Sequence, residues 1–409
     1  MKFLFILFVT IITLLPQKSF SQTETNDFSI KFGGYVNLQA IYDSRQVVAV
    51  REGHFLLYPK AVVLNSKGED INKIDNFQMA AIQTRVSAKV TGGTFLGAKT
   101  SGLVEVEFMG NSDADVNGLR IRHAFVDFKW SAVSLLVGQY WNPLFVPESF
   151  PDQIGSNGGA PFQPFARNPQ IRLSYQLGNL KTIVAAAAER DYVSIGPKGS
   201  SNEYLKNSKI PALYLQFQLK ENEHLFGLSG EYKSLLPTAV TSKNFISTNK
   251  INSYAIAGFS KFVFKPFVIK LEGVYGTNLA NYTMLGGYAV KQIDTVTQIE
   301  NYTPIKTFSA WIDLIFGNEL EFAVFAGYTK NLGSDDKIVG NYYSRGSDID
   351  NVFRVAPRIQ YKEGNVKLAF EVEYTSAAYG KKDLYGKVSN TTNAENIRVY
   401  TSVFYFLNF

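Results

Sequence analysis

Apolar and polar residues alternate along most of this chain, and the alternation is clearest in residues 397–409. Every odd-numbered residue of that stretch is apolar, aromatic or threonine, whereas the even-numbered positions include Arg398 and Ser402. Phe404 and Phe406 interrupt this more polar face. Successive side chains of a strand point to opposite faces, so the pattern predicts a strand with one continuous apolar face. A final strand of this kind, ending on an aromatic residue, is typical of the closing strand of an outer-membrane β-barrel.

The same alternation, bounded by turn residues, predicts sixteen strands along the chain. No motif repeats at a fixed period, which argues against a propeller or a solenoid. The expected strands are 28–43, 80–91, 102–110, 118–129, 132–140, 169–177, 180–190, 211–220, 223–234, 252–264, 267–276, 305–316, 319–329, 352–362, 365–375 and 395–409.

Connections between these strands alternate between short and long. Pairs such as Gly178-Asn179 and Gly317-Asn318 suit tight hairpins, because they supply the backbone angles that such turns require. Long connections include 44–79 and 141–168, and only 92–101 and 111–117 blur the contrast. Short turns on one side and long loops on the other are typical of outer-membrane barrels. The sequence therefore predicts an all-β fold, in which residues 22–409 form one sixteen-stranded antiparallel transmembrane β-barrel.

The N-terminal residues 1–21 predict a secretory signal peptide. Lys2 precedes a largely apolar run at 3–15, and Ser19-Phe20-Ser21 offers small residues for cleavage. The run is shorter than the roughly 20 residues that a membrane-spanning helix needs. The chain has no cysteine, which excludes disulfides and lipid attachment at an N-terminal cysteine. We therefore expect a protein of the outer membrane of a Gram-negative bacterium, in contact with its lipid.

Charge and motifs give no case for nucleic acid or a cofactor. The formal net charge is +6, and removal of Lys2 and Lys18 with the acid-free signal peptide leaves +4. Such a small excess is weak evidence for anionic partners and none for nucleic acid. The chain contains no glycine-rich loop of the kind that cradles phosphates, and we expect no cofactor.

The parity of each predicted strand assigns its charged residues to the barrel interior. In the strand at 80–91, Ile82 and Val86 point outward, so Arg85 and Lys89 point inward. A charged side chain that faces lipid costs about 2–4 kcal/mol at the middle of the membrane, so these side chains must face water or protein. The same argument assigns to the interior Arg120, Arg122, Arg172, Arg354, Arg358 and Arg398.

These arginines have two interpretations, and the sequence leaves both open. They are either ordinary interior residues neutralised by acids such as Glu105, Glu107, Glu371 and Glu373, or a basic ladder that attracts small anionic solutes. Guanidinium groups suit the second role because they bind carboxylate or phosphate bidentately and never lose their charge. Rings of basic side chains also give pores a preference for anions.

The connection 141–168 is rich in proline and aromatic residues. Loops of this length in compact folds are usually functional, and proline makes them stiff. We expect this loop to fold into the barrel and narrow the channel, with Glu148, Asp152 and Arg167 lining the constriction. The alternative is that it caps the barrel or packs on a neighbouring protomer.

Two runs of the sequence resemble a known family. Leu119-Arg120-Ile121-Arg122-His123-Ala124-Phe125, followed by Leu135-Leu136-Val137-Gly138-Gln139-Tyr140-Trp141, is similar to the DcaP-like trimeric porins, as is Gln83-Thr84-Arg85-Val86. The likeness covers roughly residues 30–175, and a wider kinship with phosphate-selective-type porins is also indicated. It implies a sixteen-stranded homotrimeric channel that takes up small anionic solutes such as carboxylates. It also implies that Arg85, Arg120 and Arg122 are cations of the pore wall.

Other chemistry has weaker support. Asp113 to Gly118 matches the first half of a Ca²⁺-binding loop, but Ala124 stands where such a loop needs glutamate, so a polar hairpin tip is the better interpretation. Parity puts His123 on the outer wall beside Phe125, where a subunit interface is the ordinary explanation. A rarer one is an outer-wall lipid hydrolase in which a histidine activates a serine.

We predict a passive porin rather than an enzyme, because no nucleophilic-serine motif accompanies the histidine. A barrel enzyme acting on lipids and a plugged surface receptor or adhesin remain the alternatives.

Overall fold

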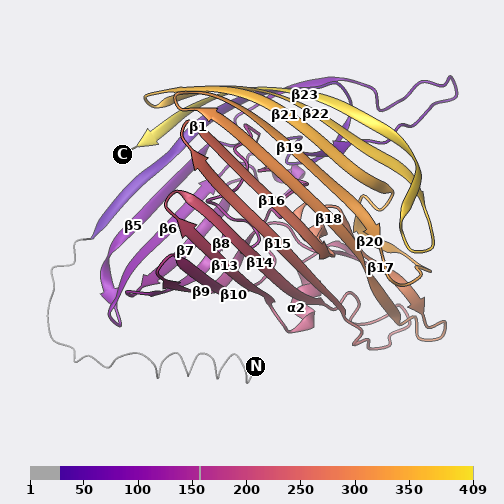
Figure 1. The fold of residues 1–409 in the computed structure, drawn as a ribbon. Helices are drawn as coiled ribbons and strands as arrows, with labels where there is room; N and C mark the ends of the chain where they lie inside the picture. The colour runs from indigo at the N-terminus through magenta and orange to yellow at the C-terminus, as the bar shows by residue number, and fades with distance from the viewer. Residues whose placement is uncertain (1–27, 156–157, 409) are drawn as a thin grey trace.

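The computed structural model describes residues 28–155 and 158–408, so the predicted signal peptide and Phe409 lie outside the described residues. Within these residues, sixteen antiparallel strands close into a barrel, because the last strand pairs with the first (Figure 1). In order around the wall they are β1 (Ser29–Asp43), β5 (Arg85–Phe95), β6 (Ala98–Glu107), β7 (Arg120–Lys129), β8 (Val133–Trp141), β9 (Arg167–Leu177), β10 (Leu180–Ala187), β13 (Ala212–Glu221), β14 (His224–Leu235), β15 (Ile251–Phe264), β16 (Phe267–Thr277), β18 (Glu300–Gly317), β19 (Leu320–Gly333), β21 (Ile349–Glu363), β22 (Val366–Lys382) and β23 (Val388–Asn408).

Shorter elements lie in the long connections, which gather at the end of the barrel that carries β17, β20 and α2 in Figure 1. No helix among the described residues is long and apolar enough to cross a membrane. These elements are β2 (Val47–Val50), β3 (Phe55–Pro59), β4 (Asn76–Ala80), β11 (Ile195–Gly196), β12 (Gly199–Ser200), β17 (Gly286–Ile293), β20 (Tyr342–Arg345), the helix α2 (Glu203–Ser208) and 3₁₀ turns at Asp113–Asp115 and Ala280–Tyr282.

The predicted fold class is confirmed, and each of the sixteen expected strands is present. Several strands extend further than their pattern predicts, and β23 begins at Val388 rather than at residue 395. The expected strand 80–91 is divided between two elements, because β4 ends at Ala80 and β5 begins at Arg85. β4 pairs with the C-terminal part of β1, and β5 pairs with its N-terminal part. The ambiguous connection 92–101 contains the tight turn Leu96-Gly97, so it belongs with the short connections.

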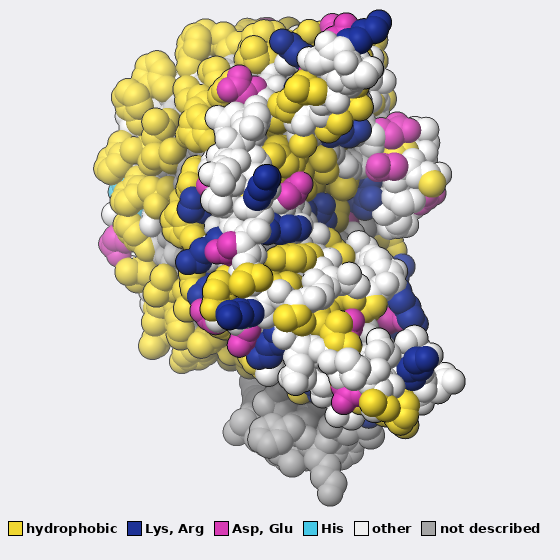
Figure 2. All heavy atoms as spheres, turned by 90° about the vertical axis from the view of Figure 1, so that its right-hand side faces the viewer, with side chains coloured by type: hydrophobic (Ala, Val, Ile, Leu, Met, Phe, Trp, Pro, Cys, Tyr) yellow, Lys and Arg dark blue, Asp and Glu magenta, His cyan; other side chains and the backbone are white. Residues whose placement is uncertain are grey.

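The outer face of the barrel is apolar. On β23, Ile397, Val403 and Tyr405 are about half exposed, whereas Arg398 and Ser402 on the other face are buried, as the alternation predicts. Figure 2 shows an apolar flank of the barrel beside the more polar end formed by the long connections. A continuous exposed apolar surface of this extent is not stable in water and needs a partner such as lipid.

The predicted parity of β7 is right as far as Arg122 and wrong from His123 onward. One extra residue, Arg122, interrupts the pairing of β6 with β7, which is the mark of a β-bulge. The bulge turns His123 and Phe125 inward, opposite Glu105 and Leu103. His123 is therefore buried inside the barrel instead of lying on the outer wall.

The predicted outward position of Ile82 is also wrong. Ile82 lies in the turn between β4 and β5, not in a strand, and it is buried. It packs in an interior cluster with Phe55, Phe145 and Phe165, which come from two long connections. A turn has no fixed parity, so the alternation of the neighbouring strand did not apply to this residue.

Three segments of the long connections fill much of the interior: the β2–β3 hairpin, the described residues of segment 142–166, and residues 278–285. Leu144, Leu279 and Tyr282 pack on a wall of small side chains that includes Ala185 and Ala257. A second cluster joins segment 142–166 and β3 to the opposite part of the wall, and its members are Leu57, Tyr58, Ala160, Phe162, Leu285, Trp311, Phe325, Ile349, Val352, Ala356 and Ala377.

Segment 142–166 reaches strands far from its own. The Ser149 hydroxyl donates to the Ser260 carbonyl on β15 at 3.0 Å, and Arg354 Nη1 on β21 donates to the Ala160 carbonyl at 2.9 Å. Gly327 on β19 makes room for this segment, because a Cβ there would lie 2.5 Å from the ring of Phe162.

We expect Gly327→Ala to displace Phe162 and loosen segment 142–166, at a cost of about 1–3 kcal/mol from overpacking. The measurement is cleavage of the folded, lipid-reconstituted protein by proteinase K, together with urea unfolding. Gly273→Ala is the matched control, because a Cβ there meets nothing within 4 Å. Equal protease resistance of the two variants would show that the contact of Phe162 does not hold the segment.

Candidate functional site

Two cavities of about 660 and 650 Å³ lie inside the barrel at the end that carries the short turns. Residues 148–155, which we name the finger, stand between them. Asp152 and Glu321 line both cavities. The finger belongs to segment 142–166, so the stiff loop singled out by its composition forms the partition.

Buried polar groups of the opposite wall hold the finger. The Asp152 amide donates to Asp313 Oδ2 at 2.9 Å, and Lys270 Nζ donates to Asp152 Oδ2 at 2.5 Å. The Ile154 amide donates to Glu371 Oε2 at 3.2 Å. Backbone amides bonded to carboxylates are among the stronger hydrogen bonds in proteins, so these contacts fix the finger against β16, β18 and β22.

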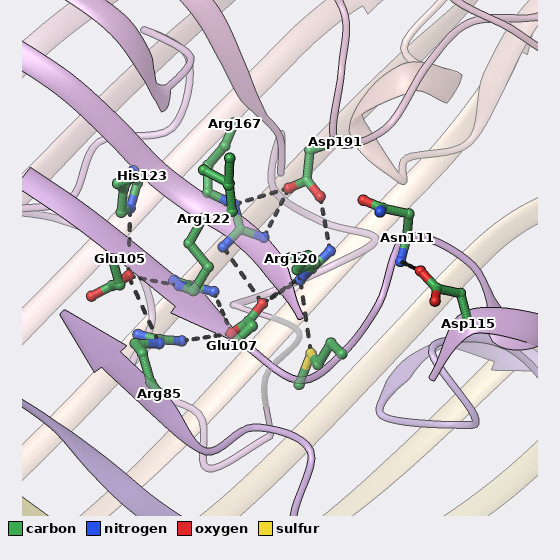
Figure 3. Close-up of polar contacts among 12 residues, drawn as sticks. Arg85, Glu105, Glu107, Asn111, Asp115, Arg120, Arg122, His123, Arg167 and Asp191 are labelled. Atoms are coloured by element: carbon green, nitrogen blue, oxygen red, sulfur yellow. Dashed lines mark hydrogen bonds and ion pairs between the residues drawn. The ribbon is translucent and has the colours of Figure 1, made fainter. Parts of the chain in front are cut away.

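A cluster of ion pairs forms one wall of the first cavity (Figure 3). Glu107, which is fully buried, accepts from Arg120, from Arg122 Nη1 at 2.9 Å and from Arg85 Nη2 at 3.2 Å. Glu105 accepts from Arg122 Nε at 2.7 Å. The bulge gives β7 two consecutive inward residues, Arg122 and His123, so the ring of His123 lies beside the cluster, with Nε2 at 3.9 Å from the Glu105 carboxylate.

Asp191, in the connection after β10, completes the cluster. Its carboxylate accepts from Arg120 Nη1 at 2.9 Å and pairs with Arg167 at 2.8 Å. Burial alone would raise the pKa of the Asp191 carboxyl, but the guanidinium groups of Arg167, Arg120 and Arg51 hold this pKa below its ordinary value.

The cluster leaves one positive charge in excess. The four guanidinium groups of Arg85, Arg120, Arg122 and Arg167 face three carboxylates, those of Glu105, Glu107 and Asp191.

Aromatic rings surround the cations that face the first cavity. Arg85 lies 5.0 Å from the centroid of the Tyr35 ring, and Arg122 lies 5.8 Å from that of Trp141. Across the cavity, Lys362 and Lys367 lie over the rings of Phe406 and Phe404. The first cavity thus combines cations with flat apolar surfaces.

No family model matches the chain, and no curated protein matches it. Solved structures do: the crystal structure of the outer membrane channel DcaP of Acinetobacter baumannii aligns with a TM-score of 0.68 and 15% identity, over 95% of this chain and 100% of that chain. This chain has a porin fold. The anion-selective porin from Comamonas acidovorans aligns with a TM-score of 0.55 and 10% identity, over 93% of this chain and 100% of that one. The outer-membrane protein OmpT of Vibrio cholerae aligns with a TM-score of 0.56 and 8% identity, over 95% and 100%.

Within this porin fold, the predicted site residues separate into two groups. Arg85, Arg122 and Asp152 line the first cavity, Glu148 and Asp152 line the second, and Lys89 is exposed. The rest are buried and line neither cavity, and they are Arg120, Arg167, Arg172, Arg354, Arg358 and Arg398.

The buried arginines of the barrel wall hold other parts of the chain. Arg398 makes a bidentate pair with Asp43 at 2.7 and 2.6 Å, and its Nη1 donates to the Gly53 carbonyl. Arg358 makes a bidentate pair with Asp313 at 2.7 and 3.0 Å. Arg172 Nη2 donates to the carbonyl of Trp141 on β8. Contact of these groups with a solute stays a prediction.

The hairpin tip at 113–118 uses its acids for the backbone. Asp113 Oδ1 accepts from the Arg51 amide at 2.7 Å, and Asp115 Oδ2 accepts from the Asn111 amide at 3.1 Å. These contacts are those of a polar turn.

Apart from Lys89, the sequence interpretation overlooked the lysines at the short-turn end of the barrel. Four pairs of lysines stand directly opposite each other on neighbouring strands. A tight hairpin pairs residues symmetrically about its turn, so Lys362 with Lys367 and Lys261 with Lys270 could have been found from the turns alone. The four pairs are Lys31–Lys89, Lys99–Lys129, Lys261–Lys270 and Lys362–Lys367.

We expect Asp191→Asn to destabilise the folded barrel at neutral pH by roughly 3–5 kcal/mol, because it removes one partner of a buried ion pair. The lowered pKa means that the carboxylate stabilises the fold fully above its ordinary value of 3.8, and that this contribution is lost as the pH falls through the lower folded value. Urea unfolding between pH 7 and pH 2 measures both effects.

Asp335→Asn is the control for this prediction, because Asp335 is an exposed partner of Lys306. Its replacement should lower the free energy of unfolding by less than about 1 kcal/mol. The free energy of unfolding of Asp191→Asn should therefore fall less than that of the parent between pH 7 and pH 2. If both fall equally, Asp191 is not the group whose protonation destabilises the fold.

Proposed function

We propose that this protein is a porin of the outer membrane of a Gram-negative bacterium. It is a passive diffusion channel for small hydrophilic solutes and prefers anions such as carboxylates. A closed barrel satisfies its backbone hydrogen bonds internally, and its apolar outer face suits contact with lipid. The similar solved structures, described as an outer membrane channel and an anion-selective porin, support the same assignment.

The observation that carries the anion preference is the set of lysine pairs at the short-turn end. Like charges directly opposite each other on neighbouring strands are destabilising. Lys362 and Lys367 face each other in this way, and both line the first cavity beside the cluster with its excess positive charge. Unneutralised cations in a narrow aqueous passage raise the local concentration of anions.

We propose a homotrimer as the assembled form. The resemblance of the 119–141 region to trimeric porins supports it, as does the description of one OmpT structure of Vibrio cholerae as a trimer form. OmpT aligns with this chain over 93% of its length at 8% identity and a TM-score of 0.56.

A plugged barrel is the second candidate, and one observation favours it. The three inward segments bury apolar side chains such as Leu144, Phe162 and Tyr282 inside the barrel. A receptor or adhesin of this kind would conduct little. An enzyme has less support, because the histidine on which the lipid-hydrolase interpretation rested faces inward.

Planar-bilayer recordings in a salt gradient test the proposal, and we expect a reversal potential that indicates anion preference. Lys362→Gln with Lys367→Gln should lower the anion-to-cation permeability ratio roughly twofold, because it removes two charges within a Debye length of the path. Lys67→Gln with Lys73→Gln removes the same charge from an exposed loop and should leave the ratio unchanged.

Preference for cations, or equal ratios in both double variants, would refute the anion preference. Absence of conductance in the parent protein would instead favour the plugged barrel.

A further inference from the structure

The second cavity is lined by lysines from four strands. Lys181 on β10, Lys220 on β13, Lys261 on β15 and Lys270 on β16 all contribute to its wall. The amide side chains of residues such as Gln218 lie among them. No aromatic ring belongs to this wall as far as the described residues go, in contrast to the first cavity.

Three of these lysines lie in one row across the sheet. Lys220 is opposite Leu225, Leu225 is opposite Lys261, and Lys261 is opposite Lys270. Directly opposite residues share a face of the sheet, so the row points into one cavity. Neighbouring strands lie about 4.8 Å apart, so the row spans roughly 15 Å. Lys181 is opposite Gln218, two residues before Lys220 on the same face.

Two of the four acids around the second cavity are engaged by lysines. Asp152 pairs with Lys270 at 2.5 Å and Glu223 with Lys265 at 2.9 Å. Glu321 lies 3.7 Å from Arg358, but Asp313 already neutralises this arginine.

Lys181, Lys220 and Lys261 form no ion pair with any described residue, and Glu148 and Glu321 are the remaining carboxylates of the wall. Three ammonium groups therefore face two carboxylates, which leaves one positive charge in excess.

We propose that the second cavity is a separate anion site, and that it takes small, multiply charged oxyanions such as sulfate. The proposal rests on the proposed channel function and deepens it. An ammonium group is a compact, strongly hydrated point charge with rotatable donors, which suits a small hydrated oxyanion more than a flat organic one. The amide groups of Gln176 and Gln218 supply further donors.

The finger makes this site independent of the first cavity. Its contacts with Asp313, Lys270 and Glu371 hold it against the wall between the two cavities. An oxyanion among the lysines of β10, β13 and β15 is therefore separated from Arg85 and Arg122 by the finger. The channel would then contain two passages with different solute preferences, one on each side of the finger.

The test is binding of sulfate to the detergent-solubilised, folded full-length barrel by equilibrium dialysis, together with block of chloride current by sulfate in planar bilayers. The variant Lys181→Gln/Lys220→Gln/Lys261→Gln should weaken sulfate binding on the order of tenfold or more, because it removes the three ammonium groups of the wall that form no ion pair. Lys362→Gln with Lys367→Gln should leave sulfate binding within about twofold of the parent, since these lysines line the other cavity.

The control for charge alone is Lys67→Gln/Lys73→Gln/Lys243→Gln, which removes three exposed loop lysines. Migration of unheated samples on SDS gels checks that every variant is folded. Equal loss of sulfate binding in the triple cavity variant and in the Lys362/Lys367 variant overturns the separate site, and so does unchanged binding in the triple cavity variant. Sulfate binding with the expected dependence in a barrel that does not conduct would support the site and refute the channel.

Discussion

Closure of the sheet between β1 and β23 is the constraint on which the rest of the structure depends. The two strands pair from Gly33 opposite Asn408 to Asp43 opposite Arg398. A lipid environment offers no hydrogen bonds to a free strand edge, so a membrane-spanning sheet must close. Closure also fixes which residues face outward. Where the pairing of β1 with β23 ends, Arg398 makes its bidentate pair with Asp43 inside the barrel. The pair ties the last strand to the first at the point where sequence-distant segments must meet.

The interior of a closed barrel is occupied either by water or by packed side chains, and this barrel has a region of each kind. At the end with the long connections, inserted segments pack on small wall residues such as Ala185 and Ala257, so that part resembles the core of a soluble protein. Buried arginines such as Arg354 and Arg398 occur there with carbonyl or carboxylate partners, because an unpaired buried charge is very costly. At the end with the short turns, the finger divides the remaining space into two cavities. The stiff, proline-rich composition of segment 142–166 suits this role, since a flexible chain would lose more conformational entropy when held across the interior.

The sequence predicted the strands well because one rule, alternation between lipid and interior, applies to every strand of such a barrel. It failed where that rule does not operate. The bulge at Arg122 changes parity within a strand and leaves no mark in the alternation, so His123 was assigned to the wrong face. Partners such as Asp191 for Arg120 lie far apart in sequence, and parity holds no information about which loop enters the interior. Two of the four lysine pairs, Lys261–Lys270 and Lys362–Lys367, were predictable from hairpin symmetry, although their role depends on which acids are engaged elsewhere.

Burial decides which cations can act on a passing solute. A guanidinium group such as that of Arg358, held bidentately by Asp313 and excluded from water, adds almost no net field to the passage because its charge is cancelled within a few ångströms. A lysine that faces a cavity without a carboxylate partner keeps its field, and low-dielectric walls concentrate that field along the aqueous path. Arginine content alone is therefore a poor guide to the selectivity of a barrel. The charge that has no partner in each cavity is the better guide, and lysines beside the short turns, such as Lys220, Lys261 and Lys367, line the cavities without an ion pair to any described residue.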